Sequence, residues 1–343
     1  MREVAIVAFA QTRHSAADEG LSEPELLLPV IGEVRAATGL RTFDFTCSGS
    51  CDYLTGAPFS FVSALDALGA WPPISESHVE MDGAWALYEA WARLQHGDAH
   101  TALVYGFGKA TQTDPHELMT LRLDPYYLAP LGLDEISCAA LQARAWLAAG
   151  GDERIMREVV RRSRAAGRAN PFALDLPDPP EDETPLVDPL RPADVAPPAD
   201  GAAAIVLAAG DRARELCERP AWITGIAHRI DPHYLGMRNL ARPASVGDAA
   251  RAAGAGKGAI DVAELDVRFS HEEPILREAL GLGGDVLVNP SGGPLCANPV
   301  MATGLIRIGE AARRVMSGSA VRALAHAASG PCLQHNLVTV LEG

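Results

Sequence analysis

Apolar residues fall along the chain in two patterns, short unbroken runs and longer stretches with helical spacing. Residues 4–8 and 202–208 are unbroken apolar runs of strand length, which are typical of strands buried on both faces. Residues 23–37, 133–149 and 152–167 instead have the length and spacing of helices. Since strands and helices alternate, the pattern predicts an α/β fold in which helices cover central sheets.

Less regular stretches complete this assignment. Alternating or apolar segments predict further strands at 42–46, 223–230 and 262–269. Short helices are predicted at 59–68 and 274–280, and Pro72 and Pro73 stop the first of them.

One block of 23 residues occurs twice. Residues 83–105 align without a gap on residues 304–326, which lie 221 positions further on. The identical pairs are Gly83/Gly304, Glu89/Glu310, Ala90/Ala311, Arg93/Arg314, Gly97/Gly318, Ala99/Ala320, Ala102/Ala323 and Leu103/Leu324. Each copy reads as a helix of small residues, a glycine and a short apolar strand. A single pair of copies indicates two related halves rather than a solenoid. If the halves pack face to face, the two helix starts meet at a shared centre, where we expect the chemistry.

Between the two copies the character of the sequence changes. Residues 110–186 hold two predicted helices within polar, irregular sequence, and residues 176–198 are rich in proline and acid, which predicts a loop or linker. This stretch therefore separates the two copies of the repeat.

Composition narrows the range of functions. The net charge of −15 argues against binding to a nucleic-acid backbone, and no apolar run approaches the ~20 residues of a membrane-spanning helix. The N-terminus reads as a first strand and not as a signal peptide. The six cysteines form no CxxC pairs, so we expect a reducing cytoplasm and no metal site.

Three segments carry a resemblance to a known family. They are NPSGGPLCANPVMATG at 289–304, DPLRPADVAPPADGAAAIVLAAG at 188–210 and LQHNL at 333–337. In sequence and order they resemble the sterol-carrier and lipid-transfer branch of the thiolase superfamily. The resemblance implies two βαβαβαββ halves related by a pseudo-twofold axis, in α/β/α/β/α layers, with a loop domain inserted in the first half. It thus implies a first half, 1–109 with 187–216, an inserted loop domain, 110–186, and a second half, 217–343. This agrees with the internal repeat.

Residues 52–90 are similar to a narrower group, the actinobacterial steroid side-chain proteins of lipid-transfer type, which act as aldol-lyases. The resemblance implies retro-aldol cleavage of a steroid side-chain 3-hydroxyacyl-CoA into a ketone or aldehyde and a shorter acyl-CoA. It implies no cofactor, because CoA is part of the substrate. It also implies a homodimer through the first-half sheet, or a hetero-oligomer with a zinc-ribbon/OB-fold acyl-CoA-binding protein.

The positions that carry thiolase chemistry have all changed in this chain. Glu80 stands where the family has its nucleophilic cysteine, and Asp266 where it has a histidine before a phenylalanine. Asn298 replaces the histidine of a glycine-rich turn, and His326 falls on or near the second cysteine. An ionised carboxylate at position 80 cannot form the usual thioester intermediate. We therefore expect no thiolase activity.

The replacements are themselves candidates for catalysis. His326 and His271 lie at strand ends and suit proton transfer near neutral pH, and Glu80 and Asp266 are ionisable. These four are the predicted catalytic residues, and we expect them to converge on one pocket with Asn298. The predicted substrate-binding residues are Asn298 as a donor to the thioester oxygen, Gly292 and Gly293 for close backbone approach, and Tyr105, the counterpart of His326 in the first repeat.

Each of these assignments has a structural alternative. Either histidine can be a satisfied core residue, Glu80 can cap the helix that begins near Asp82, and Asp266 can end a strand. Tyr126 and Tyr127 can line an acyl channel or pack under the inserted domain. The whole chain can also be a non-catalytic subunit that supports an active paralogue or partner complex. Because the replacements at three thiolase positions are ionisable, we favour a carbon–carbon lyase over that alternative.

Overall fold

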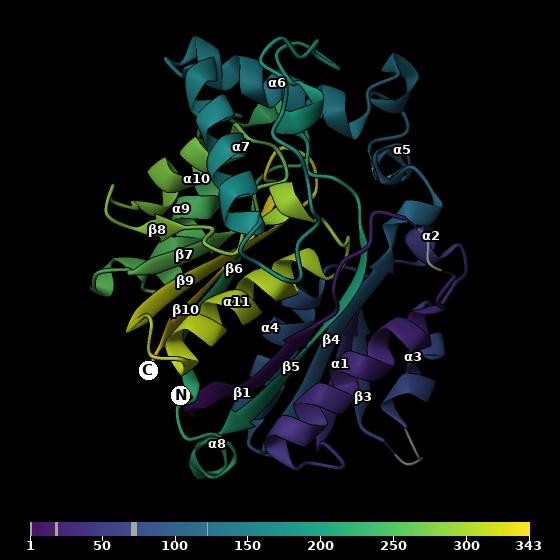
Figure 1. Cartoon of the computed structure of the whole chain (residues 1–343), viewed down its shortest axis with the longest axis vertical. Helices are drawn as coiled ribbons and strands as arrows, with labels where there is room; N and C mark the ends of the chain where they lie inside the picture. The colour runs from purple at the N-terminus through teal and green to yellow at the C-terminus, as the bar shows by residue number, and fades with distance from the viewer. Residues whose placement is uncertain (1, 18–19, 70–73, 122) are drawn as a thin grey trace.

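The computed structural model describes residues 2–17, 20–69, 74–121 and 123–343 (Figure 1). In this part of the chain the strands form one ten-stranded sheet in the order β3-β2-β4-β5-β1-β6-β10-β9-β7-β8. The strands are β1 (Val4–Gln11), β2 (Phe45–Gly49), β3 (Glu76–Val79), β4 (Thr101–Lys109), β5 (Asp200–Ala209), β6 (Ala221–Ile230), β7 (Val262–Leu265), β8 (Leu287–Val288), β9 (Arg322–Ser329) and β10 (His335–Glu342). The helices are α1 (Glu23–Thr38), α2 (Asp52–Thr55), α3 (Phe61–Leu68), α4 (Gly83–His96), α5 (Pro115–Thr120), α6 (Glu135–Ala148), α7 (Glu153–Gly167), α8 (Asp211–Leu216), α9 (Ala244–Ala252), α10 (Glu272–Leu280) and α11 (Thr303–Met316).

The strand order is symmetric about its centre. Reading outward from β1 gives β5, β4, β2 and β3, and reading outward from β6 gives β10, β9, β7 and β8. In both directions the first two steps are antiparallel and the last two are parallel. The two repeat copies, α4 with β4 and α11 with β9, therefore occupy equivalent places, as the repeat predicts.

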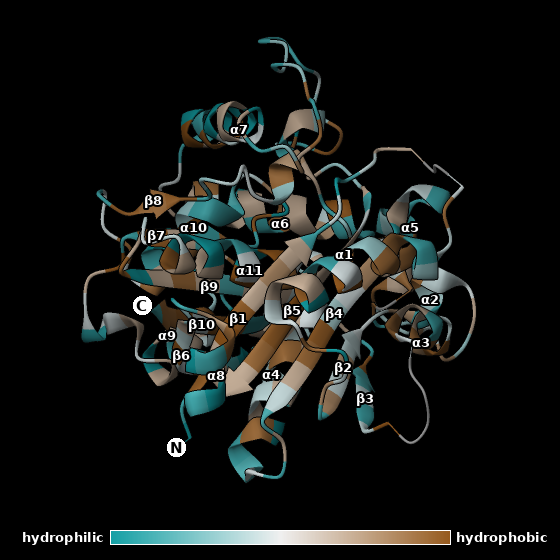
Figure 2. Ribbon diagram, turned by 60° about the horizontal axis from the view of Figure 1, so that its bottom comes forward, coloured by the Kyte–Doolittle hydropathy of each residue, from teal (hydrophilic) through white to brown (hydrophobic). Residues whose placement is uncertain are grey.

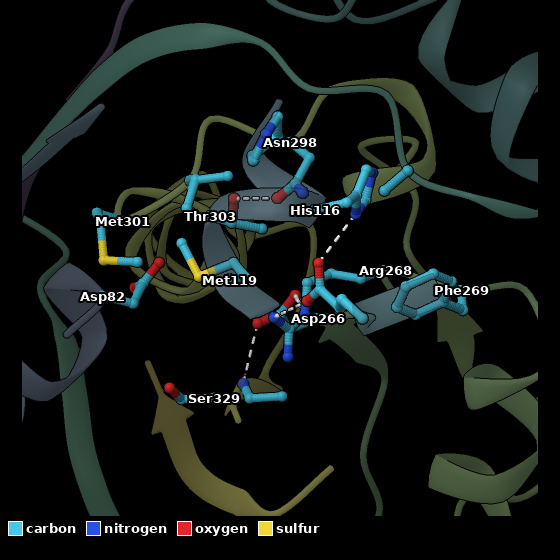
Figure 3. Close-up of a pocket in the computed structure, with 15 residues that line it drawn as sticks. Asp82, His116, Met119, Asp266, Arg268, Phe269, Asn298, Met301, Thr303 and Ser329 are labelled. Carbon is cyan, nitrogen blue, oxygen red and sulfur yellow. Dashed lines mark hydrogen bonds and ion pairs between the residues drawn. The ribbon is translucent and has the colours of Figure 1, made fainter. Parts of the chain in front are cut away.

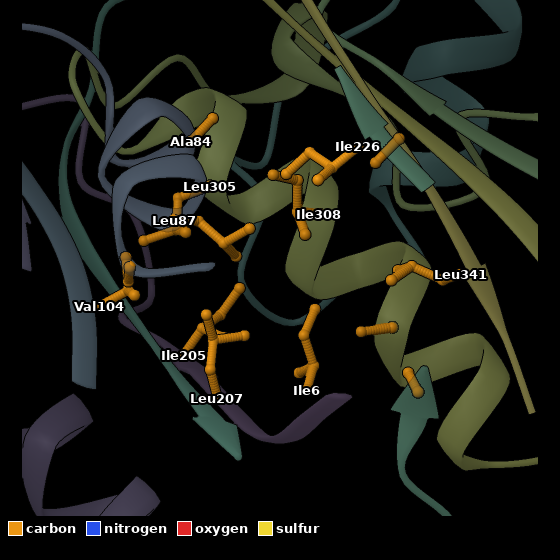
Figure 4. Packing of buried hydrophobic residues seen from close by; sticks show 14 of the residues in the cluster. Ile6, Ala84, Leu87, Val104, Ile205, Leu207, Ile226, Leu305, Ile308 and Leu341 are labelled. Carbon is orange, nitrogen blue, oxygen red and sulfur yellow. The ribbon is translucent and has the colours of Figure 1, made fainter. Parts of the chain in front are cut away.

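The two five-stranded halves touch through a short seam. Strands β1 and β6 are joined by only two residue pairs, Ala5 with Trp222 and Ile6 with Ala221. Helices α4 and α11 lie between the two halves of the sheet, where Leu87, Leu305 and Ile308 pack against strand side chains (Figure 4). This buried middle layer holds the halves together by apolar contact rather than by strand pairing.

The outer faces of the halves are covered by separate pairs of helices. Apolar residues of α1 and α3 pack on the first half of the sheet, and those of α9 and α10 pack on the second half. Figure 2 shows the apolar colour concentrated along β1, β4 and β5, which are covered from both sides. The predicted order of layers, α/β/α/β/α, is thus confirmed, and unbroken apolar strands follow from burial on both faces.

Some element boundaries differ from the prediction. The predicted strand at 262–269 ends at Leu265, because the chain turns there and places Asp266 beside β9, where it bonds to His326 and Ala328. Strand β2 begins three residues later than the predicted strand at 42–46. Strand β3 and helix α9 were not predicted, since one is short and polar and the other lacks strong periodicity.

Helices α5, α6 and α7 belong to residues 110–186 and lie at one end of the sheet (Figure 1). The division into an inserted domain and two halves at the stated residues stays a prediction. No helix in the described part of the chain is both long and apolar enough to cross a membrane.

Candidate functional site

The first turns of α4 and α11 meet at the side chain of Asp82. Its Oδ1 accepts hydrogen bonds from the backbone N–H groups of Ala84 at 2.8 Å and Leu305 at 2.9 Å, and its Oδ2 accepts one from Gly304 at 2.9 Å. The N-terminus of a helix carries partial positive charge and unpaired N–H groups. One carboxylate thus caps two helices that come from different halves of the chain.

The groups around Asp82 shift its pKa in opposite directions. Burial raises the pKa of Asp82 to about 6, and the nearby carboxylate of Asp266 adds to this rise, whereas the backbone N–H groups oppose it. Three donors take up most of the roughly four acceptor sites of its two oxygens, so Asp82 serves as a cap.

A small pocket opens beside this junction (Figure 3). It encloses about 40 Å³, which is space for a few water-sized groups. The residues that line it are Asp82, Pro115, His116, Met119, Glu135, Ala196, Asp266, Arg268, Phe269, Asn298, Val300, Met301, Thr303, Ala328 and Ser329. They come from both halves and from α5 and α6, so the pocket is where all three predicted parts of the chain meet.

Charged groups of alternating sign run along one wall of the pocket. His116 Nδ1 lies 2.9 Å from Glu135 Oε2, and the other oxygen of Glu135 lies 3.6 Å from Arg268 Nη1. Arg268 Nε lies 3.9 Å from Asp266 Oδ1. Burial lowers the pKa of His116, but the hydrogen bond and charge of Glu135 outweigh it, so that the pKa lies above its usual value.

Asp266 holds its position through one oxygen. Its Oδ2 accepts a hydrogen bond of 2.9 Å from the backbone N–H of Ala328, at the end of β9. Its Oδ1 has no hydrogen-bond partner among the described residues, although the carboxyl is only 2% exposed. A buried polar atom without a partner is costly, and such atoms are frequent at functional sites.

Asn298 is oriented by its neighbour on α11. Its Oδ1 lies 2.7 Å from Thr303 Oγ1, whose single hydroxyl hydrogen is shared between this oxygen and the C=O of Pro299 at 3.0 Å. No hydrogen bond from Asn298 Nδ2 exists among the described residues. Its backbone is fixed on both sides, because its N–H donates to Pro197 and its C=O accepts from Ala199. The amide N–H₂ group is therefore the part of Asn298 that remains for a ligand.

The structure brings Asp266 and Asn298 to the pocket and leaves Glu80 away from it. Glu80 is exposed, and its Oε1 accepts a hydrogen bond of 2.7 Å from the N–H of Asp52, the first residue of α2. It thus caps α2, whereas α4 is capped by Asp82. The expected convergence fails for Glu80 because β3 ends at Val79 and the following side chain turns towards α2.

The two predicted catalytic histidines are also outside the pocket lining. His271 is fully buried, its Nε2 lies 3.2 Å from Gln142 Oε1, and burial lowers its pKa to about 3. The ring is therefore neutral at physiological pH. Its place at the start of α10, behind Phe269, keeps it in the core.

His326 lies on β9 within a directed chain of hydrogen bonds. Asn336 donates its amide N–H₂ to Ser245 Oγ and to the C=O of Leu333, so its Oδ1 must face His326 Nε2, at 2.9 Å. His326 Nε2 therefore carries the ring proton. The side chain is fully buried, and burial lowers its pKa, which fits a core histidine that supports the fold.

The predicted substrate-binding residues other than Asn298 do not line the pocket. Gly292 and Gly293 have φ values of 94° and 65°, and a Cβ at Gly292 would meet the backbone of Gly167 at 2.8 Å. Gly292 thus allows the loop to pack on α7, and Gly293 allows it to fold back on Asn289. Tyr105 is buried on β4 against Phe107. The alternative that Tyr126 and Tyr127 pack under the inserted region is wrong, because they are 81% and 68% exposed.

Sequence reasoning missed several residues of the site. Asp82 directly precedes the first repeat copy, and Arg268 stands two positions after Asp266, so both could have been suspected. His116 and Glu135 lie in the inserted region, which has no counterpart in the second half. No group of three or more candidate metal ligands occurs in the described residues.

Known proteins show which fold this is. No family model matches the chain. A curated acetyl-CoA acetyltransferase of Methanothermobacter thermautotrophicus is 27% identical over 290 residues, which are 73% of this chain and 76% of the relative. Among solved structures, the Ltp2-ChsH2(DUF35) aldolase matches with a TM-score of 0.84 and 21% identity, over 99% of this chain and 98% of that one. Human mitochondrial 3-ketoacyl-CoA thiolase matches with a TM-score of 0.80 and 14% identity, over 100% and 99%.

These similarities agree with the symmetric strand order and with the two repeat helices in the middle layer. The resemblance to the thiolase superfamily is confirmed, and its structural neighbours include an aldolase as well as thiolases. The chain is therefore a thiolase-fold protein.

Proposed function

We propose that the chain is an aldol-lyase that cleaves a steroid side-chain 3-hydroxyacyl-CoA into a ketone or aldehyde and a shorter acyl-CoA. One observation carries the proposal. The pocket between the halves offers an amide donor at Asn298 and ionisable groups at Asp266 and His116, and none of its described lining residues is a cysteine. Thiolase chemistry needs a thiolate, whereas a retro-aldol reaction needs a proton acceptor and a donor to the thioester oxygen.

The reaction makes modest demands on the protein. A base takes the proton of the hydroxyl group on C3. C3 then becomes a carbonyl carbon as the bond between C2 and C3 breaks. The electron pair of that bond stays on C2 as a thioester enolate, which then takes up a proton and leaves as the shorter acyl-CoA. Asn298 Nδ2 would donate to the enolate oxygen, and Arg268 adds positive charge nearby. No oxidant, metal or further cofactor is needed.

A partner protein is part of the proposal. The Ltp2-ChsH2(DUF35) aldolase is named as two components, and we propose that this chain also works with a small zinc-ribbon/OB-fold acyl-CoA-binding protein. We further propose that it forms a homodimer through the first-half sheet and acts in the cytoplasm. The small volume of the pocket, about 40 Å³, favours a second candidate function, that of a non-catalytic subunit, because sites for small molecules usually enclose several hundred Å³.

The experiment is a product analysis of the purified chain, alone and with candidate partners. A steroid side-chain 3-hydroxyacyl-CoA is expected to give ketone or aldehyde and shorter acyl-CoA in equal amounts, without added CoA. The matching 3-ketoacyl-CoA with free CoA is expected to give no thiolysis, and intact-mass analysis during turnover to find no acyl group on the chain. Thiolysis with an acyl-enzyme would overturn the proposal, and inactivity with every partner would favour the non-catalytic subunit.

A further inference from the structure

His116 and Glu135 form an ion pair at the wall of the pocket. No sequence motif predicts this pair. We infer that His116 is the proton carrier of the pocket and that Glu135 positions it, an inference that rests on the proposed lyase function. His116 would take the proton of the substrate's 3-hydroxyl group and later return a proton to C2 of the enolate. Three observations support this assignment.

The first observation is the anchoring of the two side chains. His116 is the second residue of α5, whose start is capped by Asp114, with Oδ1 2.9 Å from the N–H of His116. Glu135 is the first residue of α6. Their side chains are 18% and 16% exposed, so both are held largely away from bulk solvent while lining the pocket.

The second observation is the direction of the hydrogen bond. An ionised carboxylate can only accept, so His116 Nδ1 donates to Glu135 Oε2 across 2.9 Å. No hydrogen bond from His116 Nε2 exists among the described residues, which leaves this nitrogen for a substrate. A histidine whose Nδ1–H is held by a carboxylate is a common arrangement for a general base, because it fixes both tautomer and ring orientation.

The third observation is the set of charges around the ring. Glu135 and Asp114 favour the protonated imidazole, Arg268 opposes it, and Asp266 lies on the far side of Arg268. The dashed line that leaves His116 in Figure 3 marks its hydrogen bond to Glu135 and ends close to Arg268. Arg268 stands between the carboxylates of Glu135 and Asp266. An imidazole that is hydrogen-bonded to a carboxylate can accept a proton and give it back near neutral pH.

The other histidines near the centre lack these features. In His271 and His326 the Nε2 atom faces the amide oxygen of Gln142 and Asn336 respectively, and neither residue lines the pocket. A ring buried in this way has a lowered pKa and stays neutral. His116 is thus the histidine of the pocket lining, within the described residues, that can meet a substrate.

The test compares His116→Asn, Glu135→Gln and Asp266→Asn in the full chain with its partner, with His96→Asn, an exposed residue at the end of α4, as the control. We expect cleavage to fall by about 10²–10⁴-fold in His116→Asn and to be unchanged in His96→Asn. In Glu135→Gln the loss should be smaller, and the rise of rate with pH should move to lower pH, because the carboxylate no longer raises the pKa of His116.

An NMR titration of the His116 ring gives a second readout that does not need turnover. Its midpoint should fall in Glu135→Gln relative to the wild type. Cleavage by His116→Asn within threefold of the wild type would overturn the assignment, as would an unchanged midpoint in Glu135→Gln. If the cleavage rate falls strongly in Asp266→Asn but not in His116→Asn, Asp266 is the base. If the wild type never cleaves, the proposed function fails and the catalytic assignment with it, while the titration still reports whether the pair is coupled.

Discussion

Asp82→Ala is expected to lower the free energy of unfolding by at least about 3 kcal/mol. The substitution leaves three backbone N–H groups of α4 and α11 without their acceptor at a buried place, and each unsatisfied buried donor costs about 1–3 kcal/mol. The loss should be large because one carboxylate joins helices of both halves. Denaturant unfolding monitored by circular dichroism measures it.

Asp152→Ala is the matched control for this prediction. Asp152 caps a single helix, α7, and its side chain is 37% exposed. Its replacement should therefore lower the free energy of unfolding by only about 1 kcal/mol. Two converging helix N-termini attract a small anion, so formate should raise the melting temperature of Asp82→Ala and leave Asp152→Ala unchanged. Equal losses in the two variants, with no effect of formate, would show that Asp82 does not join the halves in this way.

Asn298→Ala is expected to lower kcat for cleavage by about 10²–10³-fold with little change in melting temperature. This is the usual effect of removing one donor to a developing oxyanion. The backbone at 298 stays fixed through Pro197 and Ala199, so the substitution removes the amide and little else. Initial rates on the 3-hydroxyacyl-CoA, with the partner present, measure the effect.

Thr303→Val separates the donor from its orientation. This variant loses the hydroxyl that holds Asn298 Oδ1 but keeps the amide, so its kcat should fall less than that of Asn298→Ala. If Asn298→Ala cleaves at nearly the wild-type rate and melts normally, the thioester oxygen is bound elsewhere in the pocket.

The fold was predictable from the sequence because its signals are local. Buried strands such as 202–208 appear as unbroken apolar runs, and the copies at 83–105 and 304–326 mark equivalent places in two halves. Asn298 was found because it lies in a segment that resembles the thiolase superfamily, and Asp266 because it stands where that family has a histidine before a phenylalanine. They also lie close to the second repeat copy, at the junction that the repeat predicts.

The rest of the site depends on orientation, which one sequence does not reveal. His326 was expected at a strand end, but it lies within β9, which continues to Ser329. Its face of the strand is the one that carries Leu324 and Ala328 towards the outer helices, while Ala327 faces α11. A shift of one position changes the face of a strand residue. His116 and Glu135 meet Arg268 only through tertiary packing of the inserted helices. Glu80 was placed by alignment to a cysteine, yet its side chain turns to α2.

The measurement that tests the central claim most directly is cleavage of the 3-hydroxyacyl-CoA in D₂O. A retro-aldol reaction passes through a thioester enolate that takes up one solvent-derived proton at C2. The account therefore predicts one deuterium at C2 of the shorter acyl-CoA, with an equal amount of ketone or aldehyde and no requirement for free CoA. A shorter acyl-CoA that carries no deuterium, or that forms only when free CoA is supplied and an acyl-enzyme accumulates, would contradict it.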